Sequence, residues 1–171
     1  KHKPNITGVA TFQPVESTIR IMRKLFPKAK RIGLLWNTAE ASSLACTEKA
    51  RLAAKKYDFE LIEANVSSTG EINEGLNSLL EKGIDLFFTS GDNTVMLAVG
   101  QIAKILKSKK IPYFTNNTSD IDLGAFLSLG ADYYDVGTEI AKIAEKVFDG
   151  TNPADIPIYN FTPQTLRINT D

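Results

Sequence analysis

The sequence is poor in the residues that carry most catalytic and metal chemistry. It has one cysteine and one histidine among its 171 residues, so it cannot form an internal disulfide, and a serine or cysteine relay would have only His2 as its base. Cys46 lies in a stretch with helical periodicity, where packing is the favoured role of a lone cysteine. Cysteine and histidine never recur with the spacing of metal ligands. We therefore expect a protein that is not an enzyme and that uses neither a metal nor a cofactor.

Long apolar runs and an excess of one charge are missing as well. No run approaches the ~20 apolar residues that a membrane-spanning helix needs. The 20 lysines and arginines balance the 20 aspartates and glutamates, so no overall field attracts nucleic acid, and no nucleic-acid partner is expected. The glycine-rich fingerprints of dinucleotide-binding and P-loop proteins are missing too. The class of protein must therefore come from the pattern of strands and helices.

One local run of basic residues stands out. Residues 20–31 carry cations and no acid, namely Arg20, Arg23, Lys24, Lys28, Lys30 and Arg31. A phosphate-binding patch is conceivable here. The favoured interpretation is a solvated helix face whose cations interact with the negative end of the helix dipole.

A short apolar strand followed by an amphipathic helix is the pattern that recurs along the chain. In the clearest unit, residues 32–36 are apolar, residues 37–43 form a small polar break, and a helix follows that Ser42 or Ser43 can cap. Further strands are predicted at residues 60–65, 86–89, 111–115 and 126–129. The first three are followed by polar loops, and all of them except 111–115 are followed by a helical stripe. This alternation predicts an α/β fold, a three-layer parallel sheet with helices on both faces.

Further elements are predicted around this sheet. Residues 6–10 form a short strand, and residues 15–26 have helical spacing with Pro14 at the start. Asp132 or Asp135 can start the helix that ends at Gly150. Residues 156–160 and 166–169 are predicted to be tail strands.

The loops after the strands are the expected place for a binding site. Parallel strands place their carboxyl ends at one edge of a sheet, so loops 37–43, 66–69, 90–94 and 116–119 should line one crevice. Their short polar side chains suit the carboxylate and the ammonium group of a small ligand; these are Asn37, Thr38, Ser42, Ser43, Ser90, Asp92, Asn93 and Thr94. For Ser43 and Asn93, capping a helix is the favoured alternative. Asp92 is as well placed for binding as for capping.

Aromatic residues and carboxylates complete the candidate crevice. Trp36 and Tyr113 are favoured as core or rim residues, whereas the adjacent Tyr133 and Tyr134 cannot both face one core, so one should be exposed or line a cleft. The carboxylates are few: Glu40 and Asp92 lie near the crevice, and Asp120, Asp122 and Asp132 follow further along. A paired-carboxylate mechanism therefore has no specific support. A small α/β enzyme or ligand-sensing domain that uses the same crevice remains the alternative.

Several blocks in this order resemble a known family. They read NITGV at 5–9, KRIGLLWN at 30–37, EASS at 40–43, GDNTV at 91–95, ADYYDVG at 131–137 and PADIP at 153–157. Together they resemble the periplasmic-binding-protein-like family of ABC transporter substrate-binding proteins, in its tryptophan and tyrosine branch. Trp36 and the pair Ser90-Gly91 depart from the pattern that we expect for that family.

The resemblance implies a division of the chain. Members have two α/β lobes, and this chain corresponds to the second part of a type I-like periplasmic binding protein. Residues 1–14 would be a crossover segment, residues 15–124 the second lobe, residues 125–150 a strand and helix that return to the first lobe, and residues 151–171 tail strands. The stretch 126–148 would lack its usual sheet partner, so it would pack elsewhere or pair with another chain, and self-association is an expectation.

The resemblance also implies a function. The protein would be the solute-binding component of an ABC uptake transporter, with a small amino-acid-like ligand, an aromatic one among the candidates, between two lobes. By resemblance, the ligand contacts of this lobe come from loops 37–43 and 91–94, which contribute Asn37, Thr38, Ser42, Ser43, Gly91, Asp92, Asn93 and Thr94, while Asp132 and Tyr133 lie near the hinge. A membrane permease and its ATPase would be the partners. An extracytoplasmic location, in the periplasm or lipid-anchored at the cell surface, follows from the same resemblance.

Overall fold

A six-stranded sheet forms the centre of the structure, a computed structural model that describes residues 2–170. The strand order is β3-β2-β4-β5-β6-β8. The strands are β2 (Arg31–Trp36), β3 (Glu60–Asn65), β4 (Leu86–Thr89), β5 (Tyr113–Thr115), β6 (Leu127–Ala131) and β8 (Gln164–Ile168). Strands β2 to β6 pair in parallel, and β8 adds an antiparallel edge strand beside β6. The predicted parallel sheet is confirmed.

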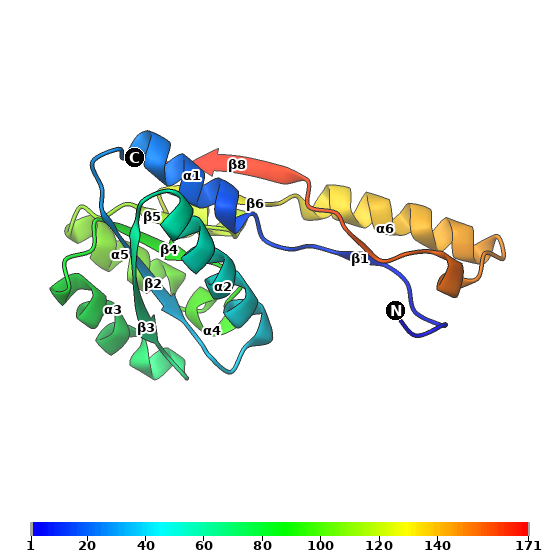
Figure 1. The fold of residues 1–171 in the computed structure, drawn as a ribbon, viewed down its shortest axis with the longest axis horizontal. Helices are drawn as coiled ribbons and strands as arrows, with labels where there is room; N and C mark the ends of the chain where they lie inside the picture. Colours follow the sequence, from blue (N-terminus) through cyan, green and yellow to red (C-terminus); the bar gives the residue numbers. More distant parts are fainter. Residues whose placement is uncertain (1, 171) are drawn as a thin grey trace.

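Helices cover both faces of this sheet, as Figure 1 shows. Helices α1 (Val15–Leu25) and α2 (Ala41–Lys56) pack on one face, with Ile32 and Leu34 of β2. Helices α3 (Ile72–Glu81), α4 (Asn93–Met96) and α5 (Val99–Ser108) pack on the other face, with Leu35 of β2. Neighbouring residues of a strand point to opposite faces, which is why a strand covered on both sides reads as a continuous apolar run. The three-layer prediction is confirmed.

An arm projects from the edge of the sheet (Figure 1). The arm consists of helix α6 (Tyr133–Phe148), the 3₁₀ turn η3 (Pro153–Asp155), and strands β1 (Val9–Ala10) and β7 (Tyr159–Asn160), which pair in parallel. Within α6 only Val136 and Ile143 are buried, and Phe148 is 89% exposed. The arm therefore leaves much of its apolar surface open to solvent.

Three connecting segments, residues 11–14, 131–132 and 161–163, join the arm to the sheet and are linked by hydrogen bonds. The Phe12 N–H donates to Oδ1 of Asn160 at 2.7 Å, and the Thr162 hydroxyl donates to the Phe12 carbonyl at 3.1 Å. The Asp132 N–H donates to the Pro163 carbonyl at 2.8 Å. The chain thus passes between the two parts side by side, at residues 11–14, 131–132 and 161–163.

Several predicted elements need correction. The stretch 126–148 was expected to lack its usual sheet partner and to pack elsewhere or pair with another chain; its strand β6 instead has partners within this chain, β5 on one side and β8 on the other. The strand at 111–115 is shorter than predicted, since Pro112 has no N–H to donate to a ladder. One helix was expected after β4, but α4 and α5 are separate, and the polar loop after β5 contains the 3₁₀ helix η2 (Thr118–Leu123). The predicted tail strands become β7 and β8, which lie in different sheets.

The predicted strand at residues 6–10 is confined to Val9–Ala10. The helix start at Asp132 is confirmed, because its side chain accepts from the N–H groups of Tyr134 and Asp135. Two residues at the ends of the predicted segments 1–14 and 151–171, Lys1 and Asp171, lie outside the described residues. In the part of the chain that is described, no helix has both the length and the apolar content to cross a membrane.

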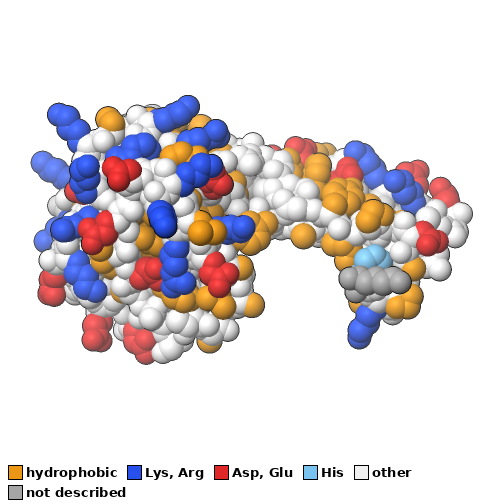
Figure 2. All heavy atoms as spheres, viewed as in Figure 1, with side chains coloured by type: hydrophobic (Ala, Val, Ile, Leu, Met, Phe, Trp, Pro, Cys, Tyr) orange, Lys and Arg blue, Asp and Glu red, His pale blue; other side chains and the backbone are white. Residues whose placement is uncertain are grey.

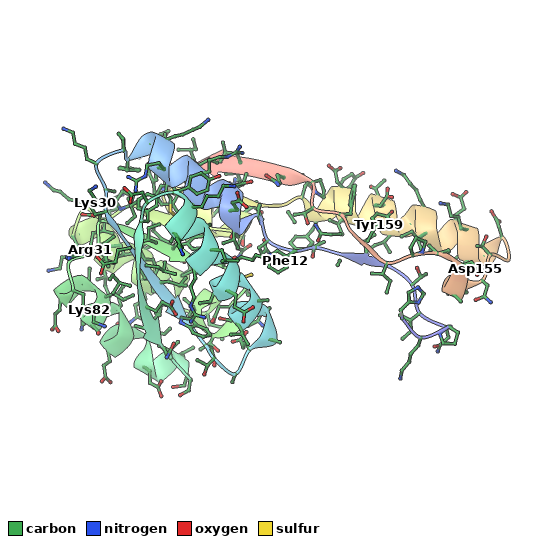
Figure 3. The ribbon with its side chains drawn as sticks, in the orientation of Figure 1. Phe12, Lys30, Arg31, Lys82, Asp155 and Tyr159 are labelled. Carbon is green, nitrogen blue, oxygen red and sulfur yellow. The ribbon has the colours of Figure 1, made fainter. Side chains whose placement is uncertain are left out.

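The basic run is a structural feature rather than an open anion site. The Arg23 guanidinium donates to the carbonyls of Pro27, Ala29, Tyr57 and Asp58 at 2.6–3.0 Å and stacks on the Phe59 ring at 3.7 Å. Lys30 and Arg31 lie with Lys82 at the end of the molecule away from the arm (Figure 3). Acidic and basic side chains alternate over this part of the visible surface (Figure 2). Arg20, Arg23 and Lys24 lie on α1, whereas Lys28 and Lys30 follow it and Arg31 begins β2, so the prediction of a helix face holds for the first three cations only.

Arg23→Lys should lower the free energy of unfolding by about 1–2 kcal/mol, because an ammonium group cannot make the forked set of hydrogen bonds to backbone carbonyls. Urea denaturation measures the change. Arg20→Lys, the same substitution on an exposed position of the same helix, is the control and should change stability by less than about 0.5 kcal/mol. Equal stability of the two variants would contradict the role given to Arg23.

Candidate functional site

A cavity of about 340 Å³ opens where the carboxyl ends of β4 and β5 meet the root of the arm. Its walls come from five places in the sequence: the segment before α1, the start of α2, the loop after β4, the end of β5 with the loop that follows it, and the start of α6. The lining residues are Gln13, Ser42, Thr89, Ser90, Gly91, Asp92, Asn93, Met96, Thr115, Asn116, Asn117, Asp120 and Tyr133. Strand-end loops far apart in the sequence therefore share one cavity, as predicted.

The structure divides the predicted site residues into two groups. Those that line the cavity are Ser42, Gly91, Asp92, Asn93 and Tyr133; those that do not are Asn37, Thr38, Ser43, Thr94 and Asp132. Loops 90–94 and 116–119 take part, and loop 37–43 contributes through Ser42. Loop 66–69, which was expected in the crevice, does not line it, because β3 is the far edge strand of the sheet.

Asp92 accepts three hydrogen bonds from within the protein. Its Oδ2 accepts from the Asn37 N–H and from the Ser43 hydroxyl, both at 2.6 Å, and its Oδ1 accepts from the Val95 N–H at 2.7 Å, which caps α4. The prediction that Ser42 or Ser43 caps α2 is wrong: Glu40 is the N-cap residue of α2, no side chain caps that helix, and the Ser43 hydroxyl turns to Asp92 instead. Asp92 thus ties the loop after β2 to the loop after β4.

Glu40 ties the same two loops from the other side. One carboxylate oxygen accepts from the backbone N–H and the side-chain amide of Asn93, both at 2.8 Å. The other accepts from the N–H and the hydroxyl of Thr94 at 2.9 and 2.6 Å. Burial alone would raise the pKa of Glu40, but these hydrogen bonds outweigh burial and lower that pKa. Asn37 joins the group by donating its amide to the Thr94 hydroxyl at 2.9 Å.

Gly91 lets the loop after β4 lie close to α2. Its φ of +63° lies in the left-handed region that favours glycine, and a Cβ there would come within 2.7 Å of the Cys46 sulfur. Cys46 is 4% exposed, and burial raises the pKa of its thiol. The predicted packing role of Cys46 is confirmed.

Asp120 is the carboxylate that the sequence did not place in the site. It is 2% exposed, its Oδ2 accepts from the Thr115 hydroxyl at 2.6 Å, and its Oδ1 accepts from the Asn117 amide at 2.7 Å. Burial raises the pKa of Asp120, and the two hydrogen bonds offset this only in part. The prediction that loop 116–119 lines the crevice is the signal that could have led to Asp120, one residue beyond it.

Two amide oxygens at the cavity have no hydrogen-bond partner among the described residues. Asn116 donates its amide to the Leu129 carbonyl at 2.6 Å and to the Thr18 hydroxyl at 2.8 Å, which leaves its Oδ1 alone. The orientation of this amide is fixed, because a carbonyl can only accept. Oε1 of Gln13 is the second such oxygen. Asn116 lies in loop 116–119, which was predicted to line the crevice, whereas Gln13 was not predicted from the sequence.

The aromatic residues behave as predicted. Tyr133 is 60% exposed and lines the cavity, and its neighbour Tyr134 is 84% exposed and does not. Trp36 and Tyr113 are buried in the core, one on each face of the sheet. Asp132, expected near the hinge, caps α6 at the root of the arm and accepts from the Thr165 hydroxyl at 3.2 Å.

The arrangement suits binding by hydrogen bonds. Among residues 2–170, no group of three histidines, cysteines, aspartates or glutamates is placed to hold a metal ion. The first turn of α2, where Ser42 lies, has N–H groups without intrahelical acceptors, which favours an anion. Asp120 and the two unpartnered amide oxygens favour a donor or a cation. A small zwitterion matches both.

Asp92→Ala should lower the free energy of unfolding by roughly 2–4 kcal/mol, because it removes the cap of α4, leaves the buried Ser43 hydroxyl without its acceptor, and leaves the Asn37 N–H with only the longer hydrogen bond to the Ser43 hydroxyl oxygen at 3.3 Å. Chemical denaturation measures the loss. Asp122→Ala removes an exposed carboxylate that pairs with an arginine, so its cost should stay below about 1 kcal/mol. A comparably small cost for Asp92→Ala would show that the two loops hold together without it.

Asp120→Asn should stabilise the protein at neutral pH. The pKa of Asp120 is higher in the folded protein than in the unfolded chain, so its ionised form opposes folding, and the opposition is present above the folded pKa and fades as the pH falls below the unfolded value. The amide removes that cost. Thermal unfolding at pH 7 and at pH 3 should show a gain at pH 7 that disappears at pH 3. A loss of stability at pH 7 would mean that the two hydrogen bonds to the carboxylate outweigh its burial.

This chain is similar to known proteins of one family. The sequence profile of the ABC transporter substrate binding protein family matches residues 1–171. A tyrosine-binding protein from Clostridioides difficile (strain R20291) is 29% identical over 167 residues, which cover 98% of this chain and 48% of that protein.

Two solved structures share the fold. A conserved domain protein from Vibrio cholerae O1 biovar El Tor superposes with a TM-score of 0.86 at 29% identity, covering 96% of this chain and 55% of that one. An ABC domain from Streptococcus pneumonia in complex with L-tryptophan superposes with a TM-score of 0.83 at 26% identity, covering 96% and 57%. The chain spans about half the length of the relatives it matches. It belongs to the ABC transporter substrate-binding protein family.

Proposed function

We propose that this chain forms one lobe of the solute-binding component of an ABC uptake transporter and that its cavity holds an aromatic amino acid. The observation that carries the proposal is the cavity itself, where loops from separate strands present short polar side chains beside one exposed aromatic ring, Tyr133. Its volume of about 340 Å³ lies in the range of small-ligand pockets. The tyrosine-binding relative and the tryptophan complex support the ligand class.

The ligand would act by favouring one arrangement of two lobes. The chain spans about half the length of its relatives, and the connecting segments at the root of the arm are a natural hinge. Binding between the lobes would select a closed arrangement, which a membrane permease and its ATPase would recognise on the extracytoplasmic side. This mechanism makes and breaks no covalent bond. We propose that Asp132 and Tyr133, at the start of α6, lie at this hinge.

The exposed face of the arm needs a partner in this scheme. Ile140, Phe148 and Ile158 are 45%, 89% and 43% exposed, and apolar side chains cover much of the arm in Figure 2. We propose that this face packs against the rest of the longer protein. Self-association of the isolated chain through the same face stays a prediction, which sedimentation would test.

The alternative is a small enzyme or sensor domain that uses the same cavity. A receptor is stabilised by its ligand alone, by about RT ln(1 + [L]/Kd). Thermal unfolding with each amino acid would separate the two, because lasting stabilisation without a change in the added compound favours the receptor. Turnover without lasting stabilisation would favour the enzyme.

Tyr133→Ala in the full-length protein should weaken the binding of L-tyrosine or L-tryptophan about tenfold, because the variant loses a ring that can pack on an aromatic ligand. Isothermal titration calorimetry measures this. Tyr134→Ala is the matched control, since Tyr134 is the adjacent residue on α6 and does not line the cavity; its affinity should be unchanged. Equal affinities of both variants and the wild type would remove Tyr133 from the site.

A further inference from the structure

The charges around the cavity are all of one sign. Of the described residues that line it, Asp92 and Asp120 are acidic, and none is a lysine, an arginine or a histidine. Asp92 receives three hydrogen bonds, two of them from backbone N–H groups. Asp120 receives two, both from neutral side chains, at 2% exposure. A buried carboxylate without a cation is costly unless something else supplies the opposite charge.

The same cavity has acceptors that nothing in the described protein fills. Asn116 is 2% exposed, and its Oδ1 has no donor, although both of its amide hydrogens are used. Oε1 of Gln13 has no donor either. Each oxygen of the Asp120 carboxylate keeps a free lone pair after its one hydrogen bond. A buried acceptor that forms no hydrogen bond lowers the stability of the folded protein. These atoms are therefore suited to accept a hydrogen bond from a ligand.

We propose that the primary ammonium group of the ligand binds in this cavity against the Asp120 carboxylate, with Oδ1 of Asn116 and Oε1 of Gln13 as its other acceptors. An ammonium group has three N–H donors and one positive charge, which matches three acceptors of which one is charged. The inference rests on the proposed function and makes it more specific: this lobe selects amines and amino acids over carboxylic acids of the same shape. Asp120 is then a specificity-determining residue.

Ligand analogues separate this inference from a general preference for aromatic compounds. Calorimetry on the full-length protein would use L-tyrosine and L-tryptophan, the amines tyramine and tryptamine, and the two matching propionic acids that lack the amino group. The propionic acids should bind at least about 30-fold more weakly than the amino acids, the factor expected when one partner of a buried charge pair is removed.

Asp120→Asn tests the residue with little change of shape. It should weaken the binding of the amino acids and amines by at least about 30-fold and leave the propionic acids no weaker than before. Asp122→Asn is the control, because Asp122 lies on the same 3₁₀ helix but is exposed and pairs with Arg167; it should leave every affinity unchanged. Thermal unfolding of both variants shows that any loss of binding is not a loss of folding.

The outcomes distinguish the two levels of the proposal. If the amino acids bind and either the propionic acids bind as tightly or Asp120→Asn keeps full affinity, the ammonium site is wrong and the proposed function stands. If no amino acid binds but the amines bind through Asp120, the proposed ligand class is wrong and the ammonium site stands. If no compound of the panel binds, both are wrong.

Discussion

The Asp92 carboxylate holds together two loops that the sequence separates by about fifty residues, and the cavity depends on this contact. Strands β2 and β4 are neighbours in the sheet, but pairing ends before their loops begin. Asp92 continues the connection beyond the strands by accepting from Asn37 and Ser43 on one loop and from Val95 on the other. Glu40 adds a second connection through Asn93 and Thr94. These loops form a rigid wall because their polar groups bond to each other.

The cavity is lined by two sets of polar groups: those around Asp92, which hold the loops together, and those around Asp120, which are suited to binding a ligand. Around Asp92 the carboxylate accepts from Asn37, Ser43 and Val95, and the Ser90 hydroxyl beside it is the one buried side-chain group of the loop after β4 without a partner among the described residues. Around Asp120 the hydrogen bonds are fewer, burial raises the pKa of the carboxylate, and the nearby amide oxygens of Asn116 and Gln13 have no donor. A folded protein tolerates such incomplete groups where a ligand completes them, since the same atoms in a closed core would only destabilise it. The side of the cavity around Asp120 is suited to recognition because a buried carboxylate lies there with two unpartnered amide oxygens.

The sequence predicted the layers of the fold better than it predicted the site. Strands β3 and β4 have the predicted bounds, because an apolar or alternating run between polar breaks depends on local periodicity. The predicted capping role of Ser43 was wrong because its hydroxyl donates to the Asp92 carboxylate and does not cap α2. The local sequence around Ser43 does not show that a residue so distant in the chain lies beside it. For the same reason, the local sequence did not predict that Gln13 lines the cavity; it does so because the connecting segments lie side by side. The pairing of β6 with β8 was not predicted because all of α6, η3 and β7, which belong to the arm, lie between these two strands in the sequence.

The cavity lies where the arm joins the sheet, so a ligand bound in it would affect the angle between these two parts. Gln13 comes from the first connecting segment and Tyr133 is the first residue of α6, whereas Asn116 follows β5, Asp120 lies in η2 and Ser42 in the first turn of α2, all on the side of the sheet. A ligand that contacts both sets bridges the joint between the arm and the sheet. Its affinity then depends on the angle at that joint, so by reciprocity its binding changes which angle is favoured. In the proposed function the hinge and the binding site would share residues, and a small molecule would then select one arrangement of the protein.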